Sequence, residues 1–165
     1  MARYSSLQTI RHHRPRKLLV VCHGNICRSP FAERLLRDQL KKETFEIISC
    51  GFHPRPGRPS PDDFVLLARL HGIDLGDHRS RVISQELVRW ADCVIIMDDK
   101  NWESLQPFMA GGAGMAGEAG KVVWLDSWGL HPEIADPYGQ NSSRAHETLK
   151  TLKNACAALA NDLTT

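Results

Sequence analysis

The chain has no long apolar segment. None of its apolar runs approaches the ~20 residues that a membrane-spanning helix needs, and its first residues lack the apolar core of a secretion signal. A membrane-spanning protein, or one exported by such a signal, is therefore not expected. The chain has 165 residues, of which 42% are hydrophobic and 24% charged, values that suit one globular domain with a buried core.

Acidic residues are missing from one end of the chain. The first 17 residues hold five Arg or Lys and no Asp or Glu, whereas the remainder holds 16 basic residues against 19 acidic ones. A mildly acidic body does not suit nucleic acid as a partner. We expect residues 1–16 to be a basic, flexible leader and residues 17–165 to be the folded domain. Contact of the leader with a membrane surface or a partner is an alternative.

The cysteines form neither a disulfide framework nor a metal-binding motif. Their number, five, is odd, and without a secretion signal they predict reduced thiols in the cytoplasm. A metal site on Cys22, His23 and Cys27 lacks a second Cys/His pair with ligand spacing, so neither a metal nor a cofactor is expected. The other three cysteines lie in apolar stretches and are expected in the core, namely Cys50, Cys93 and Cys156.

Short apolar runs alternate with amphipathic stretches. Ser29, Ser60 and Ser84 are the expected N-caps of three helices, and a longer helix is expected near the C-terminus. This order predicts a single doubly wound α/β domain, with a four-stranded parallel sheet and helices on both faces. Residues 109–120 are rich in Gly and Ala and are expected to form a loop. The four expected strands span residues 17–22, 45–51, 93–98 and 121–125.

Polar residues gather in the loop between the first strand and the first helix, "VCHGNICRSPFAERLL", where α/β proteins usually place their chemistry. Five residues separate Cys22 from Arg28. So tight a loop can turn backbone N–H groups inward as an anion cup, with Gly24 giving conformational freedom and Asn25 bracing it. The guanidinium of Arg28 is able to bind two oxygens of one phosphate. The positive potential of the helix N-terminus favours a thiolate at Cys22. The loop therefore predicts phosphoryl transfer through a cysteinyl-phosphate.

Other interpretations of this loop fit less well. An ATP-binding loop needs Gly-Lys-Ser/Thr before the helix, where this chain has Cys-Arg-Ser. A structural turn would not require Gly, Asn and Ser together. A phosphatase also needs a general acid, and Asp136 in "ADPYG" follows the fourth strand, with Tyr138 shortly after it. An ordinary Asp-Pro turn is the alternative for that segment.

The two motifs together, "VCHGNICRSPFAERLL" and "ADPYG", resemble the low-molecular-weight protein tyrosine phosphatases. The likeness extends to "SCGF", "HGIDLGDHRSR", "ADCVIIMDDKN" and the last helix, from about Lys17 to Leu159. It implies a four-stranded parallel sheet, no metal, and hydrolysis of phosphotyrosine in proteins. A bacterial tyrosine kinase of polysaccharide export is one substrate that the family suggests.

This resemblance implies a role for each matching residue of the loop. Cys22 would be the nucleophile, Arg28 the phosphate clamp, and Asp136 the general acid and later the base. Asn25 would brace the loop, and the hydroxyl of Ser29 would stabilise the thiolate. The phosphate-binding loop would also contain His23, Gly24, Asn25, Ile26, Cys27 and Ser29.

Residues outside that loop would support it, again by resemblance. Ser49 would be the partner of the loop asparagine, and His78 and Asp98 would form a supporting polar pair. Cys27, inside the loop, would trap the nucleophile as a reversible disulfide.

The substrate slot departs from the common pattern of the family. Tyr138 would form one wall, whereas the second wall falls to Phe52 or His53 in a different frame. His23 stands where a small or aliphatic residue is usual, and the segment 109–120 has no usual counterpart.

Three other activities are possible on this scaffold. Arsenate reductases need further redox cysteines on a mobile segment, but Cys93 lies in an expected strand. Arginine-phosphate phosphatases typically carry Thr where this chain has Ile26. A non-catalytic phosphate-binding module would have lost the nucleophile or the acid, and both are present.

Overall fold

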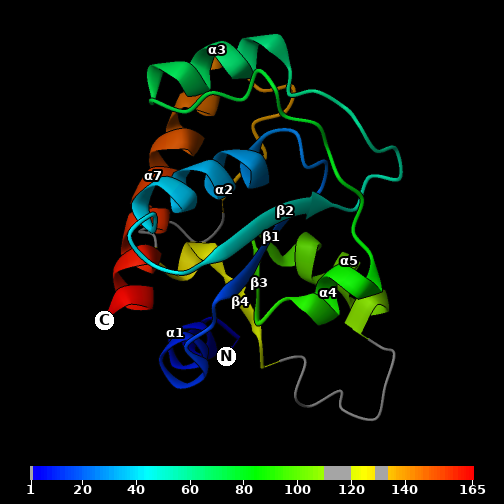
Figure 1. Ribbon diagram of the computed structural model, residues 1–165. Coiled ribbons are helices and arrows are strands. Elements are labelled where there is room, and N and C mark those ends of the chain that lie inside the picture. Colours follow the sequence, from blue (N-terminus) through cyan, green and yellow to red (C-terminus); the bar gives the residue numbers. More distant parts are fainter. Residues whose placement is uncertain (1, 110–119, 129–133) are drawn as a thin grey trace.

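A four-stranded parallel sheet organises the chain, in the order β2-β1-β3-β4 (Figure 1). The structure is a computed structural model that describes residues 2–109, 120–128 and 134–165. The expected four-stranded parallel sheet is confirmed. Its strands are β1 (Lys17–Cys22), β2 (Glu46–Gly51), β3 (Cys93–Ile96) and β4 (Val122–Trp124).

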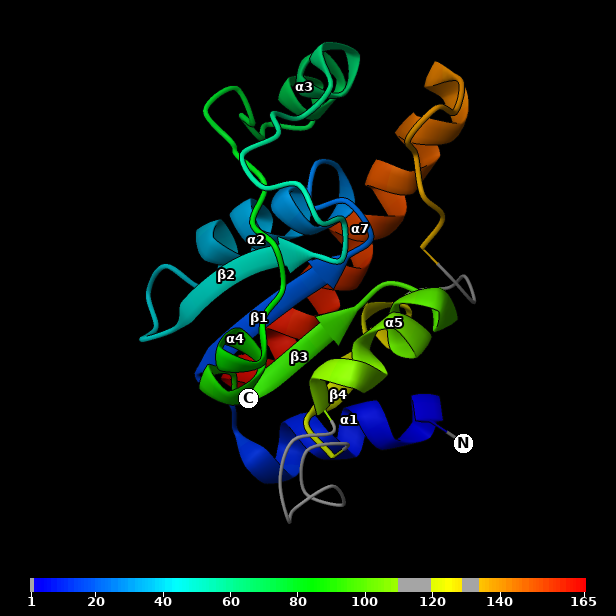
Figure 2. The same cartoon turned by 90° about the vertical axis from the view of Figure 1, so that its right-hand side faces the viewer.

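Helices cover both faces of this sheet, as the alternation of elements predicts (Figure 2). Helices α2 and α7 pack on one face, and α4 and α5 pack on the other. No helix among the described residues is long and apolar enough to cross a membrane. The helices are α1 (Ala2–His13), α2 (Arg28–Gln39), α3 (Asp62–Leu70), α4 (Gln85–Trp90), α5 (Asp99–Met109), the short 3-10 helix η1 (Leu125–Trp128) and α7 (Ser142–Thr164).

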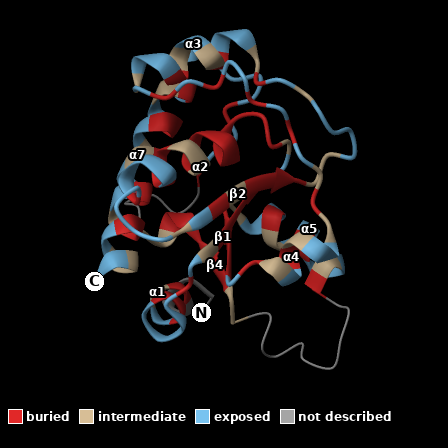
Figure 3. Ribbon diagram, in the orientation of Figure 1, coloured by how far each residue is buried: buried red, intermediate tan, exposed pale blue. Residues whose placement is uncertain are grey.

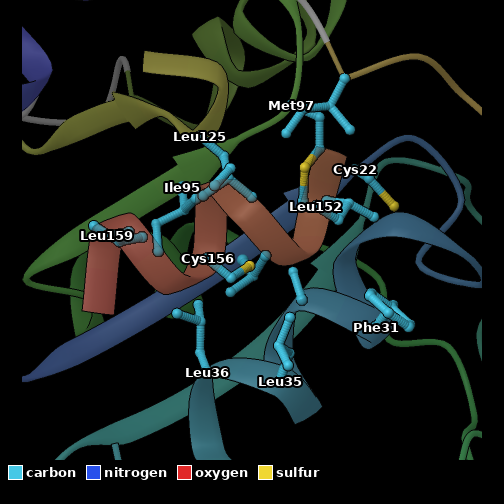
Figure 4. Packing of buried hydrophobic residues seen from close by; sticks show 14 of the residues in the cluster. Cys22, Phe31, Leu35, Leu36, Ile95, Met97, Leu125, Leu152, Cys156 and Leu159 are labelled. Carbon is cyan, nitrogen blue, oxygen red and sulfur yellow. The ribbon is translucent and has the colours of Figure 1, made fainter. Parts of the chain in front are cut away.

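Strand β1 lies at the centre of the core because its side chains alternate between two apolar clusters. Leu18 and Val20 face the cluster formed with α2 and α7, whereas Leu19 and Val21 face the cluster formed with α4 and α5. Figure 3 shows buried residues along the sheet, and Figure 4 shows the first cluster, in which Cys22 ends the strand. The three cysteines expected in the core are buried there: Cys50, Cys93 and Cys156.

Two of the three expected serine caps are wrong. Ser84 does cap α4, because its Oγ accepts a hydrogen bond of 3.2 Å from the backbone N–H of Leu87. Helix α2 instead begins at Arg28, and Ser29 turns its hydroxyl toward the preceding loop. Helix α3 follows Pro61, without a side-chain cap.

The N-terminal segment is helical instead of forming the flexible leader expected for residues 1–16. Ile10 of α1 is buried, Thr9 donates a hydrogen bond to the carbonyl of Gly120, and Ser6 Oγ accepts one of 3.1 Å from the backbone N–H of Trp124 in β4. Tertiary contacts of this kind stabilise a helix whose own sequence has little amphipathic pattern, which is why the sequence did not reveal it. Of the expected Gly/Ala-rich loop, residues 110–119 lie outside the described residues.

Candidate active site

The loop after β1 closes on the sulfur of Cys22. The backbone N–H of Asn25 donates to Cys22 Sγ at 3.3 Å, and the hydroxyl of Ser29 lies 3.0 Å from the same sulfur. Asn25 has a φ of 52°, the left-handed conformation that asparagine tolerates better than most residues. The sulfur therefore has polar hydrogens around it at the carboxyl end of a central strand, which stabilises a thiolate.

The side chain of Asn25 holds the loop in this shape. Its Nδ2 donates to Ser29 Oγ at 2.8 Å and to Ser49 Oγ at 2.9 Å. Its Oδ1 accepts from the backbone N–H of Arg81, and its own carbonyl oxygen lies 2.6 Å from His78 Nε2. The geometry thus places Ser49 beside Asn25, as the resemblance implies, and adds Arg81, which the sequence did not indicate.

A glycine in β2 allows the loop to lie this close to the sheet. A Cβ atom added at Gly51 would come within 2.7 Å of the backbone nitrogen of Asn25. Only glycine avoids that clash, so the "SCGF" segment has a packing role beside the site.

Arg28 lies almost fully buried at the start of α2. Its Nη1 donates to Asp98 Oδ2 at 2.6 Å and to the carbonyl of Ile134 at 2.9 Å, and its Nη2 lies 3.1 Å from Asp136 Oδ2. Burial alone would lower the pKa of Arg28, but the negative charges of Cys22, Asp136 and Asp98 outweigh burial and raise it. Its Nε is buried and has no hydrogen-bond partner among the described residues, so this donor is available to an anion.

His78 and Asp98 support different groups instead of forming a polar pair. His78 lies against the loop carbonyl of Asn25, whereas Asp98 holds the guanidinium of Arg28. Burial lowers the pKa of His78, which keeps the imidazole neutral under the loop. The expected pairing of the two residues is therefore corrected.

A pocket of about 220 Å³ opens above Cys22. Asp136 and Tyr138 line it from the segment after η1, as expected, and His53 lines it from the loop after β2. Phe52 does not fit the expected second wall, because it packs on Phe108 at 6.3 Å between ring centroids, in the second apolar cluster. The chain bends after β2, where the backbone N–H groups of Phe52 and His53 both donate to the carbonyl of His23, and of the two side chains only that of His53 lines the pocket.

Arg58 also lines the pocket, and sequence reasoning did not select it. Its Nη2 donates to the carbonyl of Gly24 at 2.8 Å, and its backbone N–H donates to Ser80 Oγ at 2.9 Å. The only signal in the sequence was its place in the Pro/Gly-rich stretch "HPRPGRPSP", where Gly57 adopts a φ of 73°.

The remaining cysteine of the loop, Cys27, is buried and lines the pocket together with Cys22. Burial, followed by the charge of Cys22, raises the pKa of the Cys27 thiol, so this sulfur stays protonated. Within the described part of the chain, no three His, Cys, Asp or Glu residues are arranged to hold a metal ion. The pocket is therefore lined by Cys22, Arg58 and Asp136, and the buried guanidinium of Arg28 lies 3.1 Å from the carboxylate of Asp136.

Comparison with known proteins places the chain among phosphatases. The family model for low molecular weight phosphotyrosine protein phosphatase matches residues 17–165. A probable low molecular weight protein-tyrosine-phosphatase, EpsP, of Ralstonia nicotianae is 33% identical over 141 residues, covering 86% of this chain and 91% of that protein.

Two solved structures share the fold. The crystal structure of the Erwinia amylovora tyrosine phosphatase AmsI aligns with a TM-score of 0.81 and 29% identity, over 92% of this chain and 95% of that one. The arginine phosphatase YwlE of Geobacillus stearothermophilus aligns with a TM-score of 0.77 and 26% identity, over 91% of this chain and 94% of that one.

Proposed function

The chain belongs to the low molecular weight phosphotyrosine protein phosphatase family, and on that premise we propose that Cys22, Arg28 and Asp136 carry out its reaction. The enzyme is a protein tyrosine phosphatase that hydrolyses phosphotyrosine through a cysteinyl-phosphate. The observation that carries the assignment of roles is the cup itself. Cys22 and Asp136 line one pocket, and Arg28, whose Nε has no hydrogen-bond partner among the described residues, lies 3.1 Å from the Asp136 carboxylate.

In the first step, the phosphate enters the cup and the thiolate of Cys22 attacks phosphorus. The sulfur–phosphorus bond forms as the bond from phosphorus to the tyrosine oxygen breaks. The protonated carboxyl of Asp136 gives its proton to that leaving oxygen. Arg28 and the loop N–H groups bind the oxygens on which negative charge is concentrated, and Asp98 fixes the direction of the guanidinium.

In the second step, a water molecule attacks the phosphorus of the cysteinyl-phosphate. Asp136, now a carboxylate, takes a proton from that water, and Cys22 leaves as a thiolate. The hydroxyl of Ser29, 3.0 Å from the sulfur, stabilises the thiolate both before attack and on departure.

The pocket favours phosphotyrosine over shorter phosphoamino acids because Cys22 lies at its base and is only 3% exposed. A phenyl phosphate spans from the mouth to the sulfur, whereas phosphoserine would stop short. The aliphatic side chain of Ile26 and the ring of Tyr138 line the pocket and suit an aromatic ring better than a guanidinium, which favours this substrate over phosphoarginine.

An arsenate reductase is disfavoured by the positions of the other cysteines. Cys50, Cys93 and Cys156 are buried in the apolar clusters, so none is placed to relay a disulfide from Cys22. Cys27 is suited to a protective role instead. Although burial keeps the Cys27 thiol protonated, that proton can pass to the departing hydroxyl of a sulfenic acid on Cys22 as the disulfide forms, so that water is released.

The substrate in the cell is a phosphotyrosine-containing protein in the cytoplasm, and a bacterial tyrosine kinase is one candidate. Five unpaired cysteines support a reducing compartment. The bacterial origin of relatives such as EpsP supports a bacterial substrate.

A phosphopeptide panel tests this function. Peptides of one sequence that carry phosphotyrosine, phosphoserine or phosphoarginine are compared at equal concentration, with Cys22→Ser as the inactive control. We expect kcat/KM for phosphotyrosine to exceed the other two by at least about 100-fold, which lies within the range by which pocket contacts separate related substrates. Faster release of phosphate from phosphoarginine would overturn the assignment.

A further inference from the structure

The mouth of the pocket is rich in basic side chains that the reaction itself does not use. His23, His53 and Arg58 line it, and the rings of the two histidines meet edge to face with centroids 6.4 Å apart. Among the described lining residues, Asp136 is the one carboxylate, and it already lies 3.1 Å from Arg28. A phosphate bound at the base would be held by Arg28 and the loop N–H groups, which leaves the three basic groups of the mouth without a part in binding that phosphate.

We propose that His23, His53 and Arg58 form a second anion subsite, which recognises a negatively charged group next to the phosphotyrosine of the substrate. The proposal rests on the function assigned above and specifies its substrate class as acidic phosphotyrosine peptides. The same charge could come from an Asp or Glu side chain or from a neighbouring phosphotyrosine.

Arg58 is held rigidly enough to serve such a subsite. Its backbone is joined to Ser80 by two hydrogen bonds, one of 2.9 Å to Ser80 Oγ and one of 2.8 Å from the backbone N–H of Ser80. Its Nη2 rests on the carbonyl of Gly24. Its Nε is buried without a hydrogen-bond partner in the described part of the chain. A fixed guanidinium loses little side-chain entropy when it binds an anion.

His53 is oriented as a donor by the backbone. Its Nδ1 accepts a hydrogen bond of 3.2 Å from the N–H of Arg55, so the neutral ring carries its proton on Nε2. Loss of hydration lowers the pKa of His53, and the charges of Arg58, His23 and Arg55 lower it further. An anion beside the ring would oppose that effect, so binding of the second charge and protonation of His53 favour each other.

The test compares kcat/KM for three matched peptides. One carries Ala around the phosphotyrosine, one carries Asp at the adjacent positions, and one carries a second phosphotyrosine. We expect the wild-type enzyme to prefer the Asp peptide over the Ala peptide by roughly fivefold at low salt, since several exposed charge pairs each contribute modestly. The double variant His23→Gln with His53→Gln should reduce that ratio to about 2, the part left to Arg58.

Arg89→Gln is the matched control, because Arg89 is an exposed cation of α4 that neither lines the pocket nor acts on the charge of His53. It should retain the fivefold ratio. A ratio that falls as much in this control as in the double variant would show a general charge effect and overturn the subsite. A ratio of one in the wild-type enzyme, or one unchanged in the double variant, would also overturn it.

A pH series gives a second readout that needs no variant. The groups facing His53 are His23, Arg55 and Arg58, with Asp136 across the pocket. Because His53 gains charge as pH falls toward its pKa, which lies below the ordinary histidine value of about 6.5, the Asp-to-Ala ratio should rise between pH 7.5 and pH 5.5, where Asp stays ionised. Both peptides carry the same phosphotyrosine, so its titration cancels in the ratio of their kcat/KM values. A flat or falling ratio would contradict the subsite, whereas failure to hydrolyse any of the peptides would instead refute the function itself.

Discussion

The base and the mouth of the pocket are built differently. At the base, Cys22, Asn25, Arg28 and Ser29 are each at most 3% exposed; the first, second and fourth are joined by hydrogen bonds to one another, and Arg28 is hydrogen-bonded to Asp98. At the mouth, Asp136 and Tyr138 are 45% and 63% exposed, respectively. A buried network of this kind has one arrangement, whereas exposed side chains can adjust. The base is thus suited to the chemistry shared by all substrates, and the mouth to the choice among them.

Replacement of Cys22 should give the largest loss of activity, and it changes only the base of the pocket. Cys22→Ser should lower kcat by on the order of 10⁴-fold or more, because a serine hydroxyl at this place lacks a general base to activate it. Binding of phosphate or vanadate should survive, since the loop N–H groups and Arg28 stay in place. Turnover and calorimetric binding are measured together, and activity near the wild-type level would remove Cys22 as the nucleophile.

Replacement of Asp136 at the mouth should lower the rate by an amount that depends on the leaving group of the substrate. Asp136→Asn should slow hydrolysis of phenyl phosphate by roughly 10²–10⁴-fold, because the leaving phenolate, whose conjugate acid has a pKa of ~10, needs a proton. An aryl phosphate with an electron-poor ring leaves as a stable anion and should lose much less. Rates across a series of leaving groups decide the matter. Equal losses would transfer the role to Asp98 or Asp126.

Replacement of the clamp should show how strictly the base depends on geometry. Arg28→Lys keeps the charge but loses the fork that reaches Asp98 and the phosphate together, so kcat should fall by roughly 10²–10³-fold. Steady-state kinetics on phenyl phosphate measure it. The loss must appear in kcat because the clamp also binds the transition state, and a change confined to KM would contradict that role.

Truncation of the exposed ring should affect the mouth only mildly. Tyr138→Ala removes one wall, so KM for phosphotyrosine peptides should rise by roughly 3- to 10-fold, as for the loss of one partly exposed aromatic contact. The value of kcat should change little. Tyr138→Phe is the control and should behave like the wild-type enzyme, because the proposed contact uses the ring and not the hydroxyl.

The smallest expected effect concerns stability beneath the base. Burial lowers the pKa of His78 in the folded protein, so the unfolded chain binds more protons below about pH 6.5 and stability should fall as pH falls through that value. Melting temperatures at pH 7.5 and pH 5.5 measure the change. His78→Gln should be less stable at pH 7.5, by about 1 kcal/mol for one altered hydrogen bond, but should lose less on acidification. An identical pH dependence in both proteins would mean that His78 is not responsible.

The sequence predicts the base of the pocket better than its mouth. The buried strands and the Cys22 loop follow from local patterns, because apolar runs and the spacing from Cys22 to Arg28 are read along the chain. The sequence named His53 as one of two candidates for the second wall but could not separate it from Phe52. Arg58 reaches the pocket through a loop whose path depends on a glycine turn and on pairing with Ser80, contacts that join distant positions and that no local pattern reveals.

Helix α1 shows the same limit on a larger scale. Its burial depends on β4, which lies more than 100 residues further along, and residues 1–16 alone resemble a polar leader. Similarly, the prediction that Ser29 and Ser60 are N-caps came from the general preference for serine before the first turn of a helix. At Ser29 the hydroxyl lies beside Cys22 instead, so the demand of the site took precedence over the local rule.

The contact between α1 and β4 has a consequence for synthesis on the ribosome. Ser6 and its partner Trp124 are 118 positions apart in the chain. At about 5–20 residues per second, α1 leaves the ribosome on the order of ten seconds before the strand that it covers. During that interval the nascent helix has no sheet edge to dock on and remains open to chaperones and proteases. Its docking, which waits for β4, therefore comes late in assembly.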